Sequence, residues 1–268
     1  MTAIARHEAF IDRYLDSPPQ TNETARSAIL LPAFLFLQAR FGLPLVASEL
    51  GSSAGLNQNW HRFRYEYGNW SWGDPSSPVA IACQWRGGVP PEALPVVVDD
   101  CTGCDIAPVF IDTADARRRL KSYVWPDQSA RLERLDGALA IAAAHPPRVE
   151  ASGAADWLGE RLRDTRSGNL HVLFHTIMWQ YLPAAEQARA QALIENAGRQ
   201  ATANAPIAWL RFEADGRRDG AALRLTTWDG KSLAGGTIAL GRGDFHGRWI
   251  DWQPTAEVID DASLNLIL

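Results

Sequence analysis

The stretch that decides the predicted fold runs Leu43-Pro-Leu-Val-Ala-Ser-Glu-Leu-Gly-Ser-Ser-Ala-Gly-Leu-Asn57. Its first half is a short apolar run of the kind that forms a buried strand. An acid, Glu49, ends this strand, and Gly51 then lets the chain turn sharply. Small residues continue to Gly55, after which we expect a helix. In this geometry a ligand can approach main-chain N–H groups closely, because no Cβ atom stands in the way.

Composition excludes several classes of function. Hydrophobic residues make up 46% and charged residues 21% of the 268-residue chain, which is typical of a globular protein. A net charge of −5 argues against a general surface for nucleic acid or an anionic membrane. The chain contains eleven tryptophans, which we interpret mainly as packing residues.

The N-terminal residues do not have the pattern of a signal peptide, and cysteine usage favours a reducing compartment. The most apolar run, residues 28–37, is much shorter than the roughly 20 residues of a spanning helix. Three cysteines, an odd number, do not suggest a disulfide framework. We therefore expect a soluble cytoplasmic protein that has no membrane or nucleic-acid partner.

A second informative stretch reads Pro95-Val-Val-Val-Asp-Asp-Cys-Thr-Gly-Cys-Asp-Ile-Ala-Pro108. It predicts a Val-rich strand with Asp105 at its carboxyl end, where a carboxylate can accept hydrogen bonds from both hydroxyls of a ribose. Cys101 and Cys104 leave a zinc or redox pair open as an alternative. Against this, only Cys83 remains as a further thiol ligand.

A third stretch reads Asn169-Leu-His-Val-Leu-Phe-His-Thr-Ile-Met-Trp-Gln-Tyr-Leu-Pro183. Residues 170–174 predict a buried strand beside the first one, which places His175 and Thr176 at the carboxyl edge of the sheet. There His175 can serve as a general base and Thr176 can hydrogen-bond a substrate. The alternative is a hydrogen-bonded structural histidine.

Two further segments are candidates for substrate contacts. Gln20, Asn22 and Glu23 precede an apolar helix that Gly42 can close, so they either cap that helix or cover the mouth of the site as a lid. Residues 60–95 are rich in aromatic and basic side chains, and we interpret them as an insertion that contributes Tyr65 to the substrate side.

The order of elements predicts the fold class. Strands and helices alternate over residues 43–213, and a run of strands follows. This order predicts an α/β protein with a doubly wound, mostly parallel, Rossmann-like sheet and antiparallel C-terminal edge strands. We expect one domain over residues 1–268, with an N-terminal helical cap at 1–42 and the insertion at about 60–95.

The first two stretches resemble motifs of class I S-adenosylmethionine-dependent methyltransferases. Ser53 stands where their first motif has its middle glycine, and Gly153 stands where they often have an acid after the third strand. The resemblance implies that S-adenosylmethionine is the cofactor and that a small molecule is the substrate. The implied cofactor-binding residues are Glu49, Gly51, Ser52, Ser53, Gly55, Asn57 and Asp105.

Further motifs resemble a bacterial family known as domain of unknown function 2332. They are residues 18–23, 49–57, 103–108, 123–128, 174–175 with 179–182, and 246–249. This resemblance covers nearly the whole chain, and it implies a methyltransferase-like fold without an assigned reaction.

Three functions remain open from the sequence. The first is an S-adenosylmethionine-dependent methyltransferase that acts on a small molecule. The second is a binding or regulatory protein that keeps the fold without catalysis, and Ser53 and Gly153 favour it. The third is a dinucleotide-dependent oxidoreductase, which is weaker because the first turn lacks Gly-x-Gly-x-x-Gly.

Overall fold

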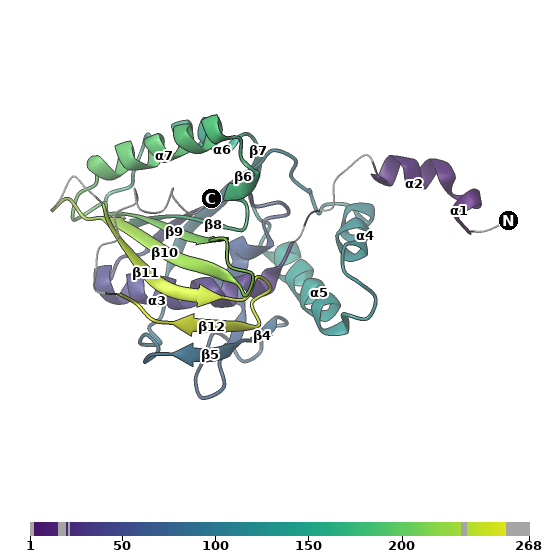
Figure 1. Cartoon of the computed structure of the whole chain (residues 1–268), viewed down its shortest axis with the longest axis horizontal. Helices are drawn as coiled ribbons and strands as arrows, with labels where there is room; N and C mark the ends of the chain where they lie inside the picture. Colours follow the sequence, from purple (N-terminus) through teal and green to yellow (C-terminus); the bar gives the residue numbers. More distant parts are fainter. Residues whose placement is uncertain (1–2, 16–19, 21, 232–234, 256–268) are drawn as a thin grey trace.

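The computed structural model describes residues 3–15, 20, 22–231 and 235–255. A nine-stranded sheet runs through the molecule in the order β5-β12-β11-β10-β9-β8-β1-β6-β7 (Figure 1). Its strands are β1 (Leu45–Leu50), β5 (Gln84–Gly87), β6 (Val98–Asp105), β7 (Val149–Ala151), β8 (Leu170–Thr176), β9 (Ile207–Glu213), β10 (Ala221–Trp228), β11 (Gly236–Gly243) and β12 (Trp249–Trp252). The helices are α1 (Ala3–Arg6), α2 (Glu8–Leu15), α3 (Ser27–Phe41), α4 (Ala114–Ser122), α5 (Ser129–Ala144), α6 (Ala154–Arg161) and α7 (Ala184–Arg199), with short 3-10 turns η1 (Thr24–Arg26), η2 (Leu56–Arg62) and η3 (Trp179–Tyr181).

The parallel half of the sheet has β1 at its centre. β1 pairs in parallel with β6 on one side and β8 on the other, and β7 and β9 extend the two sides. In chain order these strands read 3-2-1-4-5, the order of a doubly wound sheet whose connections reverse direction at the first strand. Ligands of such sheets bind at the carboxyl ends beside this reversal, which here lies beside Glu49.

The antiparallel half confirms the predicted C-terminal strands, except at the edge. β10, β11 and β12 pair in antiparallel fashion beside β9. However, the outermost strand is β5, which comes from the predicted insertion and pairs in parallel with β12. The insertion is therefore part of the main sheet as well as of a small sheet of β2 (Arg64–Glu66), β3 (Ser71–Trp72) and β4 (Ala80–Ala82).

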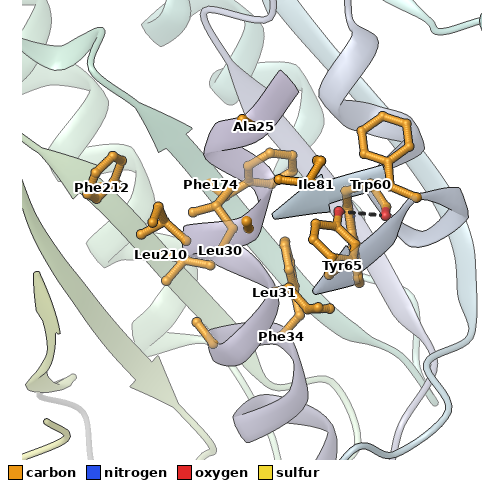
Figure 2. Packing of buried hydrophobic residues seen from close by; sticks show 14 of the residues in the cluster. Ala25, Leu30, Leu31, Phe34, Trp60, Tyr65, Ile81, Phe174, Leu210 and Phe212 are labelled. Atoms are coloured by element: carbon orange, nitrogen blue, oxygen red, sulfur yellow. Dashed lines mark hydrogen bonds between the residues drawn. The ribbon is translucent and has the colours of Figure 1, made fainter. Parts of the chain in front are cut away.

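Helix α3, which falls within the expected N-terminal helical cap over residues 1–42, lies in the core. Ten of its fifteen residues are buried, and its side chains reach the main sheet, η2 and the small sheet (Figure 2). Phe34 stacks on Trp60 at 4.0 Å between ring centroids and meets the edge of Phe174. Gly42 ends the helix in a left-handed conformation, as predicted.

The other face of the sheet is covered by α6 and α7 (Figure 1). Alternation along β8 and β9 sends Phe174 and Leu210 toward α3, and Leu173 and Trp209 toward α6 and α7. The same alternation sends His175 toward α6 and α7. Helices on both faces confirm the doubly wound arrangement.

The N-terminal helices α1 and α2 project away from the sheet, and α2 contacts the α4 region through Tyr14 (Figure 1). The hydroxyl of Tyr14 is 2.5 Å from that of Ser122, and its ring is 6.0 Å from the ring of Tyr123. In the described part of the chain, no helix is long and apolar enough to cross a membrane.

Truncation of Phe34 tests the central role of α3. Because Phe34 is fully buried, Phe34→Ala should lower the free energy of unfolding by ~3–5 kcal/mol through lost transfer energy and cavity formation. Phe36→Ala, on the same helix but only partly buried, is the matched control and should cost clearly less. Urea denaturation followed by tryptophan fluorescence measures both, and equal losses would contradict this packing.

Candidate functional site

The turn after β1 is shaped by two glycines at positive φ. Gly51 has φ +68°, and an added Cβ would lie 3.0 Å from Met178. Gly55 also has φ +68°, and its added Cβ would lie 2.7 Å from both Pro147 and Val149. The turn is therefore packed on two sides. A larger residue at Gly51 or Gly55 would have a strained backbone, and its Cβ would collide with neighbouring side chains.

Ser53, at the top of this turn, also has a positive φ, +53°. Its N–H donates to Asp105 Oδ2 at 2.8 Å, and its hydroxyl donates to Gln20 Oε1. Asn22 donates to the same hydroxyl oxygen at 2.6 Å and accepts from the N–H of Ala54 at 3.3 Å. The structure thus brings Gln20 and Asn22 onto the predicted cofactor turn.

The remaining predicted residues of the turn face inward. Ser52 is buried, and its hydroxyl donates to the carbonyl of Glu49 at 3.0 Å. This hydroxyl occupies the space above Gly103, where a Cβ would collide with it. Asn57 lies on η2, a 3-10 turn that replaces the expected α-helix, and its buried Oδ1 has no hydrogen-bond partner among the described residues.

Asp105 ends β6 beside the turn, as predicted. Both of its carboxylate oxygens accept main-chain hydrogen bonds, from Ser53 and from Ala107 at 2.9 Å. Gln20 donates to the carbonyl of Ala107 at 2.6 Å, so it joins the two loops. Here Asp105 holds the loops together, and a ribose would have to share or replace its bonds.

Glu49 is a buried acid beneath the turn. Burial raises the pKa of Glu49 to about 8, the nearby Ser52 side chain opposes this shift, and the negative charge of Asp105 adds to it. One carboxyl oxygen, Oε2, is buried without a partner among the described residues. The side chain is therefore protonated at neutral pH and can donate a hydrogen bond.

His175 lies in a buried polar cluster with Glu213 and Trp209. Its Nδ1 is 2.6 Å from Glu213 Oε1, and its Nε2 is 3.0 Å from Trp209 Nε1. Because an indole N–H only donates, Nε2 must accept, and Nδ1–H therefore donates to the carboxylate. The ring also stacks on Trp179, with 4.9 Å between centroids, and the residue is 1% exposed. In this arrangement neither ring nitrogen is free to take a substrate proton.

The chain after His175 approaches the turn after β1. Thr176 ends β8 and is only partly buried. Ile177 has φ +51°, a strained conformation for a β-branched residue. The N–H of Met178 donates to Glu213 Oε1 at 3.1 Å, and the Met178 side chain is the one that faces Gly51.

Two predicted substrate or lid residues are structural instead, and the first is Glu23. It is buried, caps η1 through Ala25, and forms ion pairs with Arg131 at 2.9 Å and Arg134 at 3.7 Å. Burial opposes ionisation, but His246, whose Nδ1 lies 3.7 Å from Oε2, and these two arginines hold the pKa of Glu23 below its ordinary value.

The second is Tyr65, which belongs to the core. It is fully buried, and its hydroxyl donates to the carbonyl of Trp60 at 2.8 Å (Figure 2). It therefore has no surface to offer a substrate.

Cys101 and Cys104 do not form a metal or redox pair. Both lie within β6, three residues apart, so their side chains point to opposite faces of the sheet. Burial raises the pKa of the Cys104 thiol to about 12. The described residues contain no group of three His, Cys, Asp or Glu side chains that could hold a metal ion.

The sequence patterns did not reveal Glu213 and Trp209, the partners of His175. The signal for Glu213 was present, since it ends a predicted strand and the carboxyl ends of parallel strands meet at one edge. Trp209 gave no such signal, because a tryptophan within an apolar strand is normally a packing residue.

The pH dependence of stability tests the state of Glu49. Its pKa is higher in the folded protein, about 8, than the ordinary 4.5, so unfolding releases a proton between these values. Stability should therefore fall as pH rises through this window, by ~1.4 kcal/mol for each pH unit.

Glu49→Gln should remove this component and be more stable than the wild type at pH 8. The exposed Glu92→Gln is the control, and urea denaturation between pH 5 and 8 measures all three proteins. A Glu49→Gln profile that follows the wild type would show that Glu49 is ionised in the fold.

Comparisons with known proteins place the chain in a family. No curated protein matches it. A solved structure titled "Structure of the CcbJ Methyltransferase from Streptomyces caelestis" is similar at a TM-score of 0.32 and 15% identity, over 96% of this chain and 82% of that one. A family model described as "Uncharacterized protein conserved in bacteria (DUF2332)" matches residues 1–252. The chain therefore belongs to the bacterial family DUF2332.

Proposed function

We propose that the carboxyl edge of the sheet binds S-adenosylmethionine and that the protein transfers its methyl group to a small molecule. The observation that carries this proposal is the position of backbone strain. Among the described residues, Ser53 and Ile177 are the two non-glycine residues with positive φ. They follow neighbouring strands, β1 and β8, at the edge where doubly wound sheets bind ligands. Strain of this kind costs ~1–3 kcal/mol per residue and concentrates at functional sites.

The polar groups around the strain suit such a cofactor. Asp105 can accept from the two ribose hydroxyls, and the turn from Gly51 to Gly55 can lie against the aminoacid part. Protonated Glu49, which lies beneath the turn, can donate a hydrogen bond to the ligand. In the structure, Gln20, Asn22 and Asp105 form hydrogen bonds with Ser53 of the turn. We therefore propose that a ligand displaces Gln20 and Asn22 from Ser53. These two residues then act as the lid of the site.

Methyl transfer makes few demands on protein side chains. Alignment of the nucleophile with the methyl group accounts for most of the rate, and a thiolate or neutral amine needs no base. We propose that His175 and Thr176 line the acceptor side, where His175 acts as a base only if Trp209 releases Nε2. Otherwise Glu213 and Trp209 hold the imidazole as a positioning residue.

A second candidate is a binding protein without catalysis. Both nitrogens of His175 are occupied, and Gly153 leaves the position of the adenine-binding acid without a carboxylate of its own. A nearby acid, Glu186, instead accepts the N–H of Ala155 at 2.8 Å. Activity with bound cofactor distinguishes the two candidates.

Ligand titration tests the cofactor. S-adenosylhomocysteine at 100 times its dissociation constant should add ~2.7 kcal/mol to the stability of the fold. Isothermal titration with S-adenosylmethionine, S-adenosylhomocysteine and NAD identifies the class of cofactor.

Asp105→Ala should weaken cofactor binding by ~1.5–3 kcal/mol, since it removes a charged acceptor. The exposed Asp112→Ala is the control, and no heat with either sulfur compound would exclude the proposal.

The role of His175 is tested in a methyl-transfer assay once an acceptor is found. If His175 is a base, His175→Gln should lower the rate by ~10²–10⁴-fold and remove a neutral limb of the pH–rate profile, with cofactor affinity unchanged. Trp209→Phe frees Nε2 and should then raise the rate. If His175 only positions other groups, the pH profile of His175→Gln should keep its shape.

A further inference from the structure

A cavity of about 800 Å³ opens beside β7, and Ala54 of the turn after β1 forms part of its lining. Its walls come from the β6–α4 loop, the end of α5 and the segment that leads into β7. This volume falls within the ~300–1,000 Å³ range of small-molecule sites. It is therefore large enough for an organic ligand and too small for a folded partner.

Most of the lining is apolar. Val109, Phe110 and Ile111 form one wall, and Leu139, Ala142 and Pro147 another. Gly55 packs so closely on Pro147 and Val149 that a Cβ would not fit, so this part of the wall is held in place. The Phe110 side chain is 59% exposed, an unusual degree for a phenylalanine. An apolar ligand body would cover it.

The charged side chains of the lining are three arginines, Arg117, Arg148 and Arg161, and two acids, Asp112 and Glu150. Arg148 and Arg161 line the cavity, and both pair with the buried Asp100, Arg161 at 3.0 Å. A third guanidinium, that of Arg166, lies 3.8 Å from the same carboxylate. Arg148 is also 62% exposed at its side chain, so it retains donors for an anion.

We propose that this cavity binds a small amphipathic carboxylate, with the apolar body between the 109–111 and 139–147 walls and the acid on Arg148. A carboxylate is a suitable head group because guanidinium groups pair with carboxylates in a planar, two-bond geometry. The site adjoins the proposed cofactor turn, because Ala54 lines the cavity, but Asp105, Glu49 and His175 do not belong to its lining.

The test uses octanoate as the probe and 1-octanol as its uncharged match. Isothermal titration of the full chain should give saturable one-to-one binding of octanoate, and ~10-fold weaker binding of octanol, because octanol lacks the charge. A second anionic probe, anilinonaphthalene sulfonate, should gain fluorescence and be displaced by octanoate. The proposal is overturned if neither anion saturates a single site, or if octanol binds as tightly as octanoate.

Variants locate the binding. Ala143→Trp fills the cavity from its exposed rim and should abolish octanoate binding. Ala144→Trp is the matched control, because its neighbouring exposed position does not line the cavity, and it should bind normally. Arg148→Gln leaves Asp100 paired with Arg161 and should weaken octanoate by ~3–10-fold without affecting octanol. Equal binding by both tryptophan variants would place the ligand elsewhere and overturn the proposal.

Discussion

Burial of β1 on both faces is the constraint on which the rest of the structure depends. All six of its residues are buried, and parallel strands flank it on both sides. Parallel sheets need cover on both faces, because their strands have no polar side to turn toward water. The chain meets this need with α3 on one face and with α6 and α7 on the other.

The same constraint creates the candidate site. The connection that follows β1 runs over one face of the sheet, and the connection that leads into β8 runs over the other. The two connections therefore diverge at the carboxyl end of β1. Many of the polar groups that collect there are hydrogen-bonded to one another, although Glu49 Oε2 has no partner among the described residues. Ser53 is hydrogen-bonded to Gln20, Asn22 and Asp105, and the ring of His175 is held by its two buried partners. These bonds offset the strain at Ser53 and Ile177.

Local patterns predicted the elements better than the contacts between them. The strands around Glu49, Asp105 and His175 follow from apolar runs that end in polar residues, and each lies where it was expected. Glu23 looked like a lid residue because its partners, Arg131 and Arg134, are more than a hundred positions away. Tyr65 was expected on the substrate side of an aromatic and basic insertion, yet it is fully buried and its hydroxyl donates to the carbonyl of Trp60. Such contacts depend on tertiary packing, which local sequence patterns do not predict.

The parallel pairing of β5 with β12 has a consequence for the order in which the chain folds. Residues 84–87 pair with residues 249–252, so this edge joins segments more than 160 positions apart. Contacts of such long sequence separation form slowly, because a long loop must close first. During synthesis from the N-terminus, β5 has no partner until nearly the whole chain has emerged. The half of the sheet from β7 to β9 is complete earlier, so the last step of folding seals the opposite edge.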